Sequence, residues 1–117
     1  MPELQAEFEA CPRCGIDLVD VPAMRACTRC DGRWATEATL IRLATEMAAT
    51  SPAGEPYLPF LRDERAALVC PTCGNSMTTY KLHAVEIDRC ARHGIWFDVH
   101  ELQQVLYATY DPPDPLR

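Results

Sequence analysis

The residues of this chain that could bind a metal ion occur as four short pairs. Three pairs are cysteines separated by two residues, and the fourth joins a cysteine to a histidine at the same spacing. Zinc prefers thiolate and imidazole ligands, and a structural zinc site takes four of them in a tetrahedron. Seven cysteines and one histidine therefore fill two sites with no ligand left over. The expected ligands are Cys11, Cys14, Cys27 and Cys30 in an all-cysteine site, and Cys70, Cys73, Cys90 and His93 in a second site.

Other cysteine chemistry fits this pattern less well. A disulfide framework would leave one of seven thiols unpaired and would give His93 no role. A redox Cys-x2-Cys motif belongs to a parallel βαβ pattern, which neither pair follows. Four thiolates also suit iron, but the site that contains histidine favours zinc in both. We therefore expect two structural zinc ions.

The length of each repeat agrees with a metal-dependent fold. The 117 residues divide at the cysteines into two units, each of about thirty residues, a size at which an apolar core alone rarely suffices. A structural zinc ion contributes about 10 to 16 kcal/mol of apparent binding free energy, which tips a marginal fold toward the folded state. Each unit is expected to need its metal.

The charge of the chain bears on the class of partner. Eleven basic residues face seventeen acidic ones, for a net charge of -6, and seven thiolates with two zinc ions bring it to about -9. Non-specific nucleic-acid binding, which relies on lysine and arginine, is disfavoured. Pairing of the arginines with Asp17, Asp20 and Asp88 is the simpler hypothesis for their role. The arginines near the ligands that could contact nucleic acid or a partner are Arg13, Arg25, Arg29, Arg33, Arg89 and Arg92.

The chain carries no sequence signal for export. Residues 1–7 are acidic, without the positive and apolar regions of a secretory signal. No apolar run reaches the roughly 18 residues of a membrane span, and free thiolates need a reducing compartment. We expect a cytoplasmic protein that does not contact membranes.

Both repeats continue in the same way after the last ligand. A tryptophan follows, Trp34 or Trp96, and a leucine stands six residues later, Leu40 or Leu102. Apolar residues then recur at spacings of three and four, which predicts a helix.

The expected helices cover 36–49 and 98–109. Asp98 and Glu101 form a capping-box pattern at the start of the second helix, in which each side chain bonds a free backbone NH of the other residue. Thr36 is the expected cap of the first helix. Prolines beyond each helix mark its end.

A β-hairpin is expected between the inner ligands of each repeat. In the second repeat, 77–82 and 85–89 alternate around a turn at His83 and Ala84. The first hairpin is four residues shorter, and removing two residues from each strand keeps the faces unchanged because the strand period is two. The glycines that follow the pairs are expected at positive φ; they are Gly15, Gly32, Gly74 and Gly94.

Prolines interrupt the connection between the repeats. Residues 50–59 are not expected to form a helix or strand, and a short helix is predicted over 61–68. The apolar residues of this connection, Tyr57, Leu58, Phe60 and Leu61, are expected to pack against a ribbon or a partner. The predicted fold class is a small α+β zinc-binding protein with two zinc ribbons, each followed by an α-helix. The predicted domains are 1–49 (ribbon and helix), 50–69 (proline-rich linker), 70–110 (ribbon and helix) and 111–117 (proline-rich tail).

The motifs of the second repeat closely resemble those of the transcription factor IIB-type zinc ribbon family of small bacterial proteins. Its segments 70–74 and 90–98, followed by Glu101 and Leu102, match the family pattern. The first repeat is similar through Trp34, but has Thr36 and Thr39 where the family has acidic residues. The resemblance implies a tandem zinc ribbon. The family name suggests a role in transcription, but a similar fold does not establish that role.

Three classes of function remain to be compared. An enzyme is disfavoured, because four protein ligands close each metal site and because His83 and His100 have no nucleophile at a meaningful spacing. No catalytic residue and no small-molecule substrate are expected. A structural zinc-binding module for protein interaction or assembly is the leading hypothesis, supported by acidity and by the aromatic residues Tyr57, Phe60, Tyr107 and Tyr110. A regulator that binds nucleic acid or the transcription machinery is the alternative.

Overall fold

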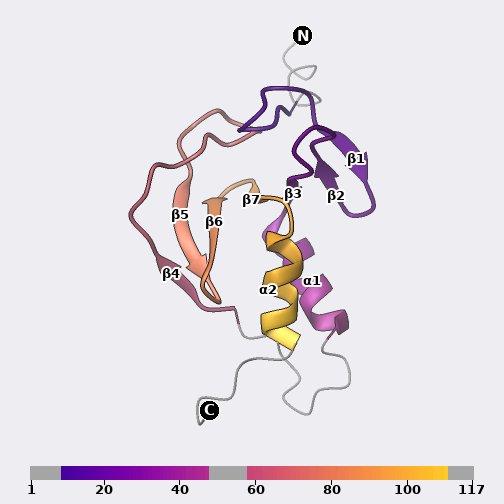
Figure 1. Ribbon diagram of the computed structural model, residues 1–117, viewed down its shortest axis with the longest axis vertical. Coiled ribbons are helices and arrows are strands. Elements are labelled where there is room, and N and C mark those ends of the chain that lie inside the picture. Colours follow the sequence, from indigo (N-terminus) through magenta and orange to yellow (C-terminus); the bar gives the residue numbers. More distant parts are fainter. Residues whose placement is uncertain (1–8, 48–57, 111–117) are drawn as a thin grey trace.

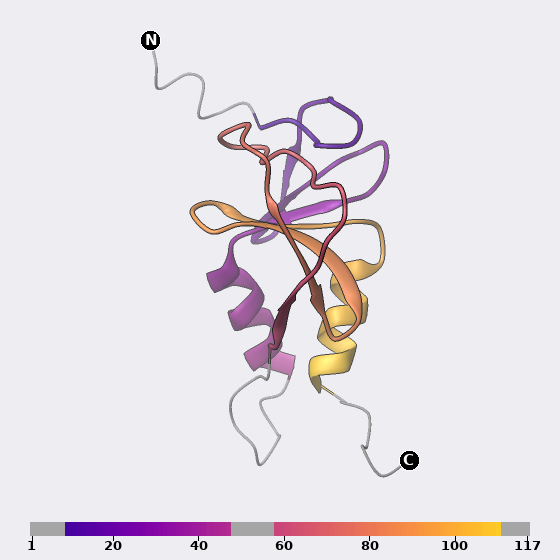
Figure 2. The same cartoon turned by 90° about the vertical axis from the view of Figure 1, so that its left-hand side faces the viewer.

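The two repeats build one antiparallel sheet. The computed structural model of the protein describes residues 9–47 and 58–110. The strand order is β1-β2-β3-β7-β6-β5-β4, and helices α1 (Glu37–Met47) and α2 (Glu101–Tyr110) pack next to each other (Figures 1 and 2). The strands are β1 (Val19–Val21), β2 (Met24–Ala26), β3 (Arg33–Ala35), β4 (Phe60–Arg62), β5 (Thr78–Leu82), β6 (Val85–Cys90) and β7 (Gly94–Phe97).

The sheet is continuous because the third strand of each repeat pairs with the other. Trp34 of β3 is the partner of Trp96 of β7, with Arg33 opposite Phe97 and Ala35 opposite Ile95. An approximate two-fold axis therefore passes through the tryptophan pair. The sequence left open whether the repeats pack together, and this pairing joins them.

The predicted hairpin of the second repeat is confirmed. β5 and β6 pair with Leu82 opposite Val85. His83 and Ala84 make the turn with φ of 54° and 68°, the left-handed backbone that a two-residue hairpin turn requires. The first hairpin, β1–β2, is shorter, as expected, with Val21 opposite Met24.

The helix predicted over 61–68 is wrong, because Phe60–Arg62 form strand β4, which pairs with β5. Phe60 packs edge-on against Tyr80, with ring centroids 5.7 Å apart. Beyond the strand, Arg65 donates to Asp63, to Asp88 and to the carbonyl oxygens of Tyr80 and Ile87. These tertiary contacts hold the segment extended along the sheet.

The helix caps follow the prediction in part. Thr36 accepts a bond from the NH of Thr39 at 3.1 Å, so it caps α1. At α2 the NH of Asp98 donates to Glu101 at 2.8 Å, which is half of a capping box. The Asp98 carboxylate accepts instead from Trp96 Nε1 at 3.0 Å and from Arg13. These contacts with Trp96 and Arg13 replace the bond that the Asp98 carboxylate would accept from a backbone NH in a full capping box.

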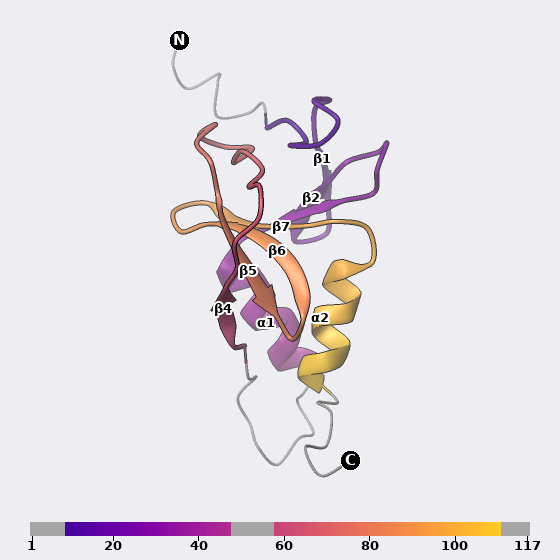
Figure 3. The same cartoon turned by 60° about the vertical axis from the view of Figure 1, so that its left-hand side comes forward.

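Side chains on the two faces of the sheet form two hydrophobic cores, because neighbouring residues of a strand point to opposite faces. Trp34 and Trp96 belong to a core with the metal-binding cysteines. Ile95 and Phe97 belong to the other core, with Leu40 of α1 and Val105 of α2. Both repeats contribute to both cores. In Figure 3 the helices α1 and α2 and the strand β4 lie below β7, whereas β1 and β2 lie above it.

The connection between the repeats is described in part. Leu58 and Phe60 pack, as expected, against the core that contains Leu40 of α1 and Val105 of α2. Leu61, in contrast, is 65% exposed. Tyr57, most of the linker and the tail lie outside the described residues. Within the described ranges, no helix is long and apolar enough to cross a membrane. The domain boundaries stay a prediction.

Candidate metal centres

The four cysteines of the first repeat converge on one point. Their sulfur atoms lie within 4.8 Å of one another, and the Sγ atoms of Cys11 and Cys30 are 3.7 Å apart. A zinc tetrahedron with bonds of about 2.3 Å separates its sulfur atoms by about 3.8 Å. The donor set and the spacing both fit zinc.

The second repeat forms the predicted mixed site. Cys70, Cys73, Cys90 and His93 also place their ligand atoms within 4.8 Å of one another. His93 Nδ1 lies 3.6 Å from Cys70 Sγ and 3.4 Å from Cys90 Sγ. These separations suit a tetrahedron of sulfur and nitrogen ligands around zinc, which is somewhat smaller than one of sulfur alone. Two zinc ions therefore fit the chain.

Backbone NH groups point at the sulfur atoms of the first group. The NH groups of Arg29 and Cys30 donate to Cys27 Sγ at 3.3 and 3.4 Å. Burial alone would raise the pKa of the Cys27 thiol, but these two donors, together with hydrogen bonds to the Cys30 and Cys11 side chains, lower the pKa to about 7. Burial raises the pKa of Cys30 to about 12. Zinc would displace the protons that such thiols retain at neutral pH.

The second group also contains one thiol with a lowered pKa and one with a raised pKa. The NH of Asn75 lowers the pKa of Cys73 to about 7, against the effect of burial. Burial raises the pKa of Cys70 to about 11. The NH groups of Thr72 and Cys73 donate to Cys70 Sγ at 3.3 and 3.5 Å. These donors stabilise negative charge on sulfur and orient the ligand.

Three of the four glycines have the expected positive φ, namely Gly15, Gly74 and Gly94. Gly15 and Gly74 both have φ of 77°. In the first repeat, however, Asp31 takes the left-handed position with φ of 61°, and Gly32 does not. Gly32 is required for space, because a Cβ atom there would lie 2.2 Å from Trp96 Cζ2. The glycine of one repeat thus receives the tryptophan of the other.

Gly94 occupies the corresponding position in the second repeat. Its φ is 156°, and a Cβ atom there would lie 2.6 Å from the carbonyl oxygen of Ala35 and 3.4 Å from Trp34 Cζ2. The strand β3 of the first repeat therefore passes too close for a side chain. The sequence pattern located both glycines but did not reveal what packs on them.

Four of the six arginines near the ligands are held in ion pairs. Arg13 donates to both carboxylate oxygens of Asp98, at 2.5 and 2.8 Å. The other pairs are Arg25 with Glu9 and Asp20, both at 3.1 Å, Arg33 with Asp31 at 2.6 Å, and Arg89 with Glu37 at 2.6 Å. Asp20 is thus a partner as expected, whereas Asp88 pairs with Arg65.

The remaining two arginines differ from these four. Arg29 and Arg92 are exposed and make no ion pair with the residues that the structure describes. Each stands two positions after the first ligand of its pair, Cys27 or Cys90. Their role as contact residues stays a prediction.

Glu9 is a residue that the motif analysis did not single out. Its carboxylate accepts from the hydroxyl of Thr72 in the second repeat and from Trp34 Nε1 at 3.4 Å. It also pairs with Arg25. Glu9 precedes the first metal ligand, and no short-range pattern connects it to Thr72.

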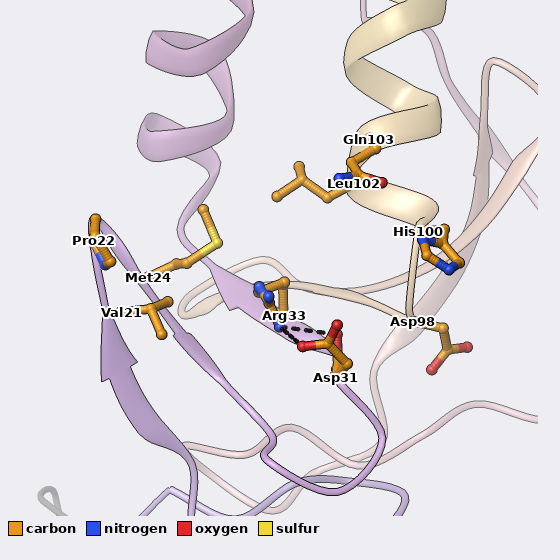
Figure 4. A pocket seen from close by; sticks show the side chains of 9 residues that line it. All are labelled: Val21, Pro22, Met24, Asp31, Arg33, Asp98, His100, Leu102 and Gln103. Carbon is orange, nitrogen blue, oxygen red and sulfur yellow. Dashed lines mark hydrogen bonds and ion pairs between the residues drawn. The ribbon is translucent and has the colours of Figure 1, made fainter.

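A pocket of about 340 Å³ lies between the β1–β2 turn and the start of α2. Its charged groups already have partners: Arg33 bonds Asp31 (Figure 4), and Asp98 is held by Arg13. His100 is exposed at the rim, with φ of 71°. Neither predicted metal group lines this pocket, so the metal centres are separate from it. The other lining residues are Val21, Pro22, Met24, Leu102 and Gln103.

Comparison with known protein families identifies the second repeat. The family model described as a transcription factor zinc-finger, of the zinc ribbon type found in transcription factor IIB, matches residues 69–108. No curated protein and no solved structure gives a significant match. The matched range holds the whole second metal group, the β5–β6 hairpin and most of α2. The second repeat of this chain is a transcription factor IIB-type zinc ribbon.

Proposed function

We propose that the chain is a zinc-stabilised protein-interaction module that takes up an extended segment of a partner protein along β1. The observation that carries this proposal is a difference between the hairpins of the two repeats. β5 has a neighbour on both sides, β6 and β4, whereas β1 pairs only with β2 among the strands of residues 9–47 and 58–110. An open strand edge offers backbone NH and carbonyl groups to an added strand.

The second repeat indicates what such an added strand would look like. Superposing the two hairpin turns makes β1 the counterpart of β5, with Val21 at the position of Leu82. On β5 the neighbour is β4, an antiparallel strand of three residues. A partner segment on β1 would therefore run antiparallel to it.

The side chains of β1 define the chemistry of that segment. Val19 is 42% exposed, and the Asp20 side chain is 84% exposed. Successive residues of a strand point to opposite faces. The Asp20 carboxylate pairs with Arg25 at 3.1 Å but is exposed enough to accept a second donor. The matching partner segment has a lysine or arginine opposite Asp20 and apolar residues on either side of it.

The ion pairs of the arginines favour a protein over a nucleic acid. Phosphate binding needs arginines and lysines that are free to displace the counterions condensed on the nucleic acid. Arg13, Arg25, Arg33 and Arg89 are already paired with carboxylates of the chain, and the net charge is -6. A partner protein does not need these groups.

An edge substitution tests the proposal. Val19→Lys places a charge at the edge, and Ile41→Lys on α1 is a matched control because Ile41 is 43% exposed. Partners captured from the cells that make the protein should be lost from Val19→Lys and retained by Ile41→Lys, with equal zinc content in both. Backbone amides of Val19–Val21 should exchange more slowly in the purified complex.

Other results would contradict the proposal. Protection of α1 or α2 amides with β1 unchanged would place the partner elsewhere. A dimer that dissociates on Val19→Lys would show a second copy at the edge. If deleting residues 1–8 made the β1 amides exchange faster, as removal of a partner would, the edge would be covered by the chain itself.

Nucleic-acid or transcription-machinery binding is a second candidate, favoured by the exposed Arg29 and Arg92 and by the description of the matching family. In this case Arg29→Ala and Arg92→Ala should each weaken binding at low salt and reduce its salt dependence. Arg42→Ala on α1 is the control, since Arg42 pairs only with Glu46 in the described part of the chain. Binding that ignores both substitutions would exclude this candidate.

We propose a structural and not a catalytic role for zinc. A catalytic zinc site keeps a position open for water or substrate, whereas each group here brings four strong ligands together. Thiolate ligands persist in a reducing compartment, which supports a cytoplasmic location. Turnover of any substrate that requires bound zinc would overturn the structural assignment.

A further inference from the structure

The two metal groups are parts of one core. Buried residues of that core come from both repeats: Cys11, Cys27 and Trp34 from the first, Cys70, Met77 and Trp96 from the second. A core of this kind cannot be completed by one repeat alone. Its apolar surface is removed from water only when both repeats are folded.

The tryptophans connect each repeat to the metal-binding segment of the other. Trp96 lies directly over Gly32, two residues after the ligand Cys30. Trp34 reaches Gly94, the residue after the ligand His93. An unfolded second repeat would therefore remove the side chain that covers the first metal group, and the reverse also holds.

Polar contacts between the repeats end at the same segments. Arg13, between the ligands Cys11 and Cys14, pairs with Asp98 of the second repeat. Thr72, between Cys70 and Cys73, donates to Glu9 of the first repeat. Arg89 of β6 pairs with Glu37 of α1. Each repeat thus contacts the other through a residue that lies between its own metal ligands.

We propose that the two zinc sites load and release metal as one cooperative unit, because neither ribbon forms its core without the other. Zinc at one group stabilises the β3–β7 pairing and the exchanged tryptophans, which preorganise the second group. Binding at one group therefore raises the affinity of the other. This coupling is reciprocal, so its size is the same whichever group is loaded first.

A zinc titration of the full chain tests the proposal. Metal-free chain is prepared by chelation under reducing conditions and titrated with zinc while native mass spectrometry counts ions and amide exchange reports each hairpin. Amides of Thr78–Leu82 and of Met24–Ala26 should gain protection in parallel. A species with one zinc ion in which one hairpin is fully protected and the other is not would overturn the proposal.

Ligand substitutions at matched positions provide a second measurement. Cys14→Ser should weaken zinc binding at the intact Cys70 group at least tenfold, and Cys73→Ser should weaken the Cys11 group by a similar factor. If either variant retains one zinc ion with the affinity and amide protection of the wild type, the sites are independent. Because such variants could fail to fold, the wild-type titration decides alone in that case.

A variant that loosens the contact between the repeats adds a graded test. Arg13→Ala combined with Thr72→Ala removes two exposed contacts between the repeats and no metal ligand. The one-zinc species should become more abundant in this variant. The control Arg42→Ala, which removes an ion pair within α1, should leave its abundance unchanged. Equal abundance in all three proteins would contradict coupling through these contacts.

Discussion

Trp34 and Trp96 are direct partners across β3 and β7, and each packs on a glycine of the other repeat. The tryptophan that follows the last ligand in each repeat therefore stabilises the junction between repeats as well as its own ribbon. Both rings belong to the core that contains the metal-binding cysteines. The junction is thus the most sensitive place to test the fold.

Gly32→Ala should destabilise the protein by about 1 to 3 kcal/mol, the usual range for overpacking a core. The added Cβ would meet Trp96 Cζ2 at 2.2 Å, so the ring or the strand must move. Chemical denaturation of the zinc-loaded protein measures the loss. Adding Trp96→Phe should relieve part of it, and a double-mutant cycle that shows no coupling between these positions would contradict the packing.

The Arg13–Asp98 pair predicts an unequal response of its two partners. Arg13→Ala should lower stability by about 1 kcal/mol or less, because Arg13 is 48% exposed and exposed ion pairs contribute little. Asp98→Ala should cost more, about 1 to 3 kcal/mol, because it also leaves the buried Trp96 Nε1 without its acceptor. Denaturation midpoints of the two variants test the order. Equal losses would show that the bond to Trp96 contributes nothing.

Asp88 should be among the polar residues least tolerant of substitution. Its side chain is 4% exposed, and it accepts from Arg65 at 3.1 Å and from the NH of Leu68 at 2.9 Å. Removing one partner of a buried ion pair typically costs about 3 to 5 kcal/mol. Asp88→Ala should therefore release the segment after β4, seen as faster amide exchange over 63–68. Glu86→Ala is the control, since Glu86 is 57% exposed and contacts the same arginine.

The sequence predicted those parts of the protein that depend on nearby residues. The ligands, the β5–β6 turn and both helices follow from spacing, turn chemistry and periodicity. β4 was missed because three residues carry no clear period, and because the contacts of Arg65 that hold the segment extended come from β5 and β6. The β3–β7 pairing has no local signal, since Trp34 and Trp96 are far apart in the chain. The sequence pattern singled out Gly32 for a positive φ, whereas the structure requires glycine there because a side chain would collide with Trp96.

Zinc affinity should rise with pH across the neutral range. Without metal, Cys30 and Cys70 have pKa values raised to about 12 and 11, so each group still holds a thiol proton at pH 8 that zinc must displace. This predicts a gain in affinity of at least about tenfold per pH unit. Cys27 and Cys73, with pKa values lowered to about 7, take up protons as the pH falls below 7. The dependence should therefore become steeper there, with the sign unchanged. Competition with a chelator of known pH dependence at pH 6, 7 and 8 measures the slope, and an affinity that is constant over this range would show that the thiols are already ionised before zinc binds.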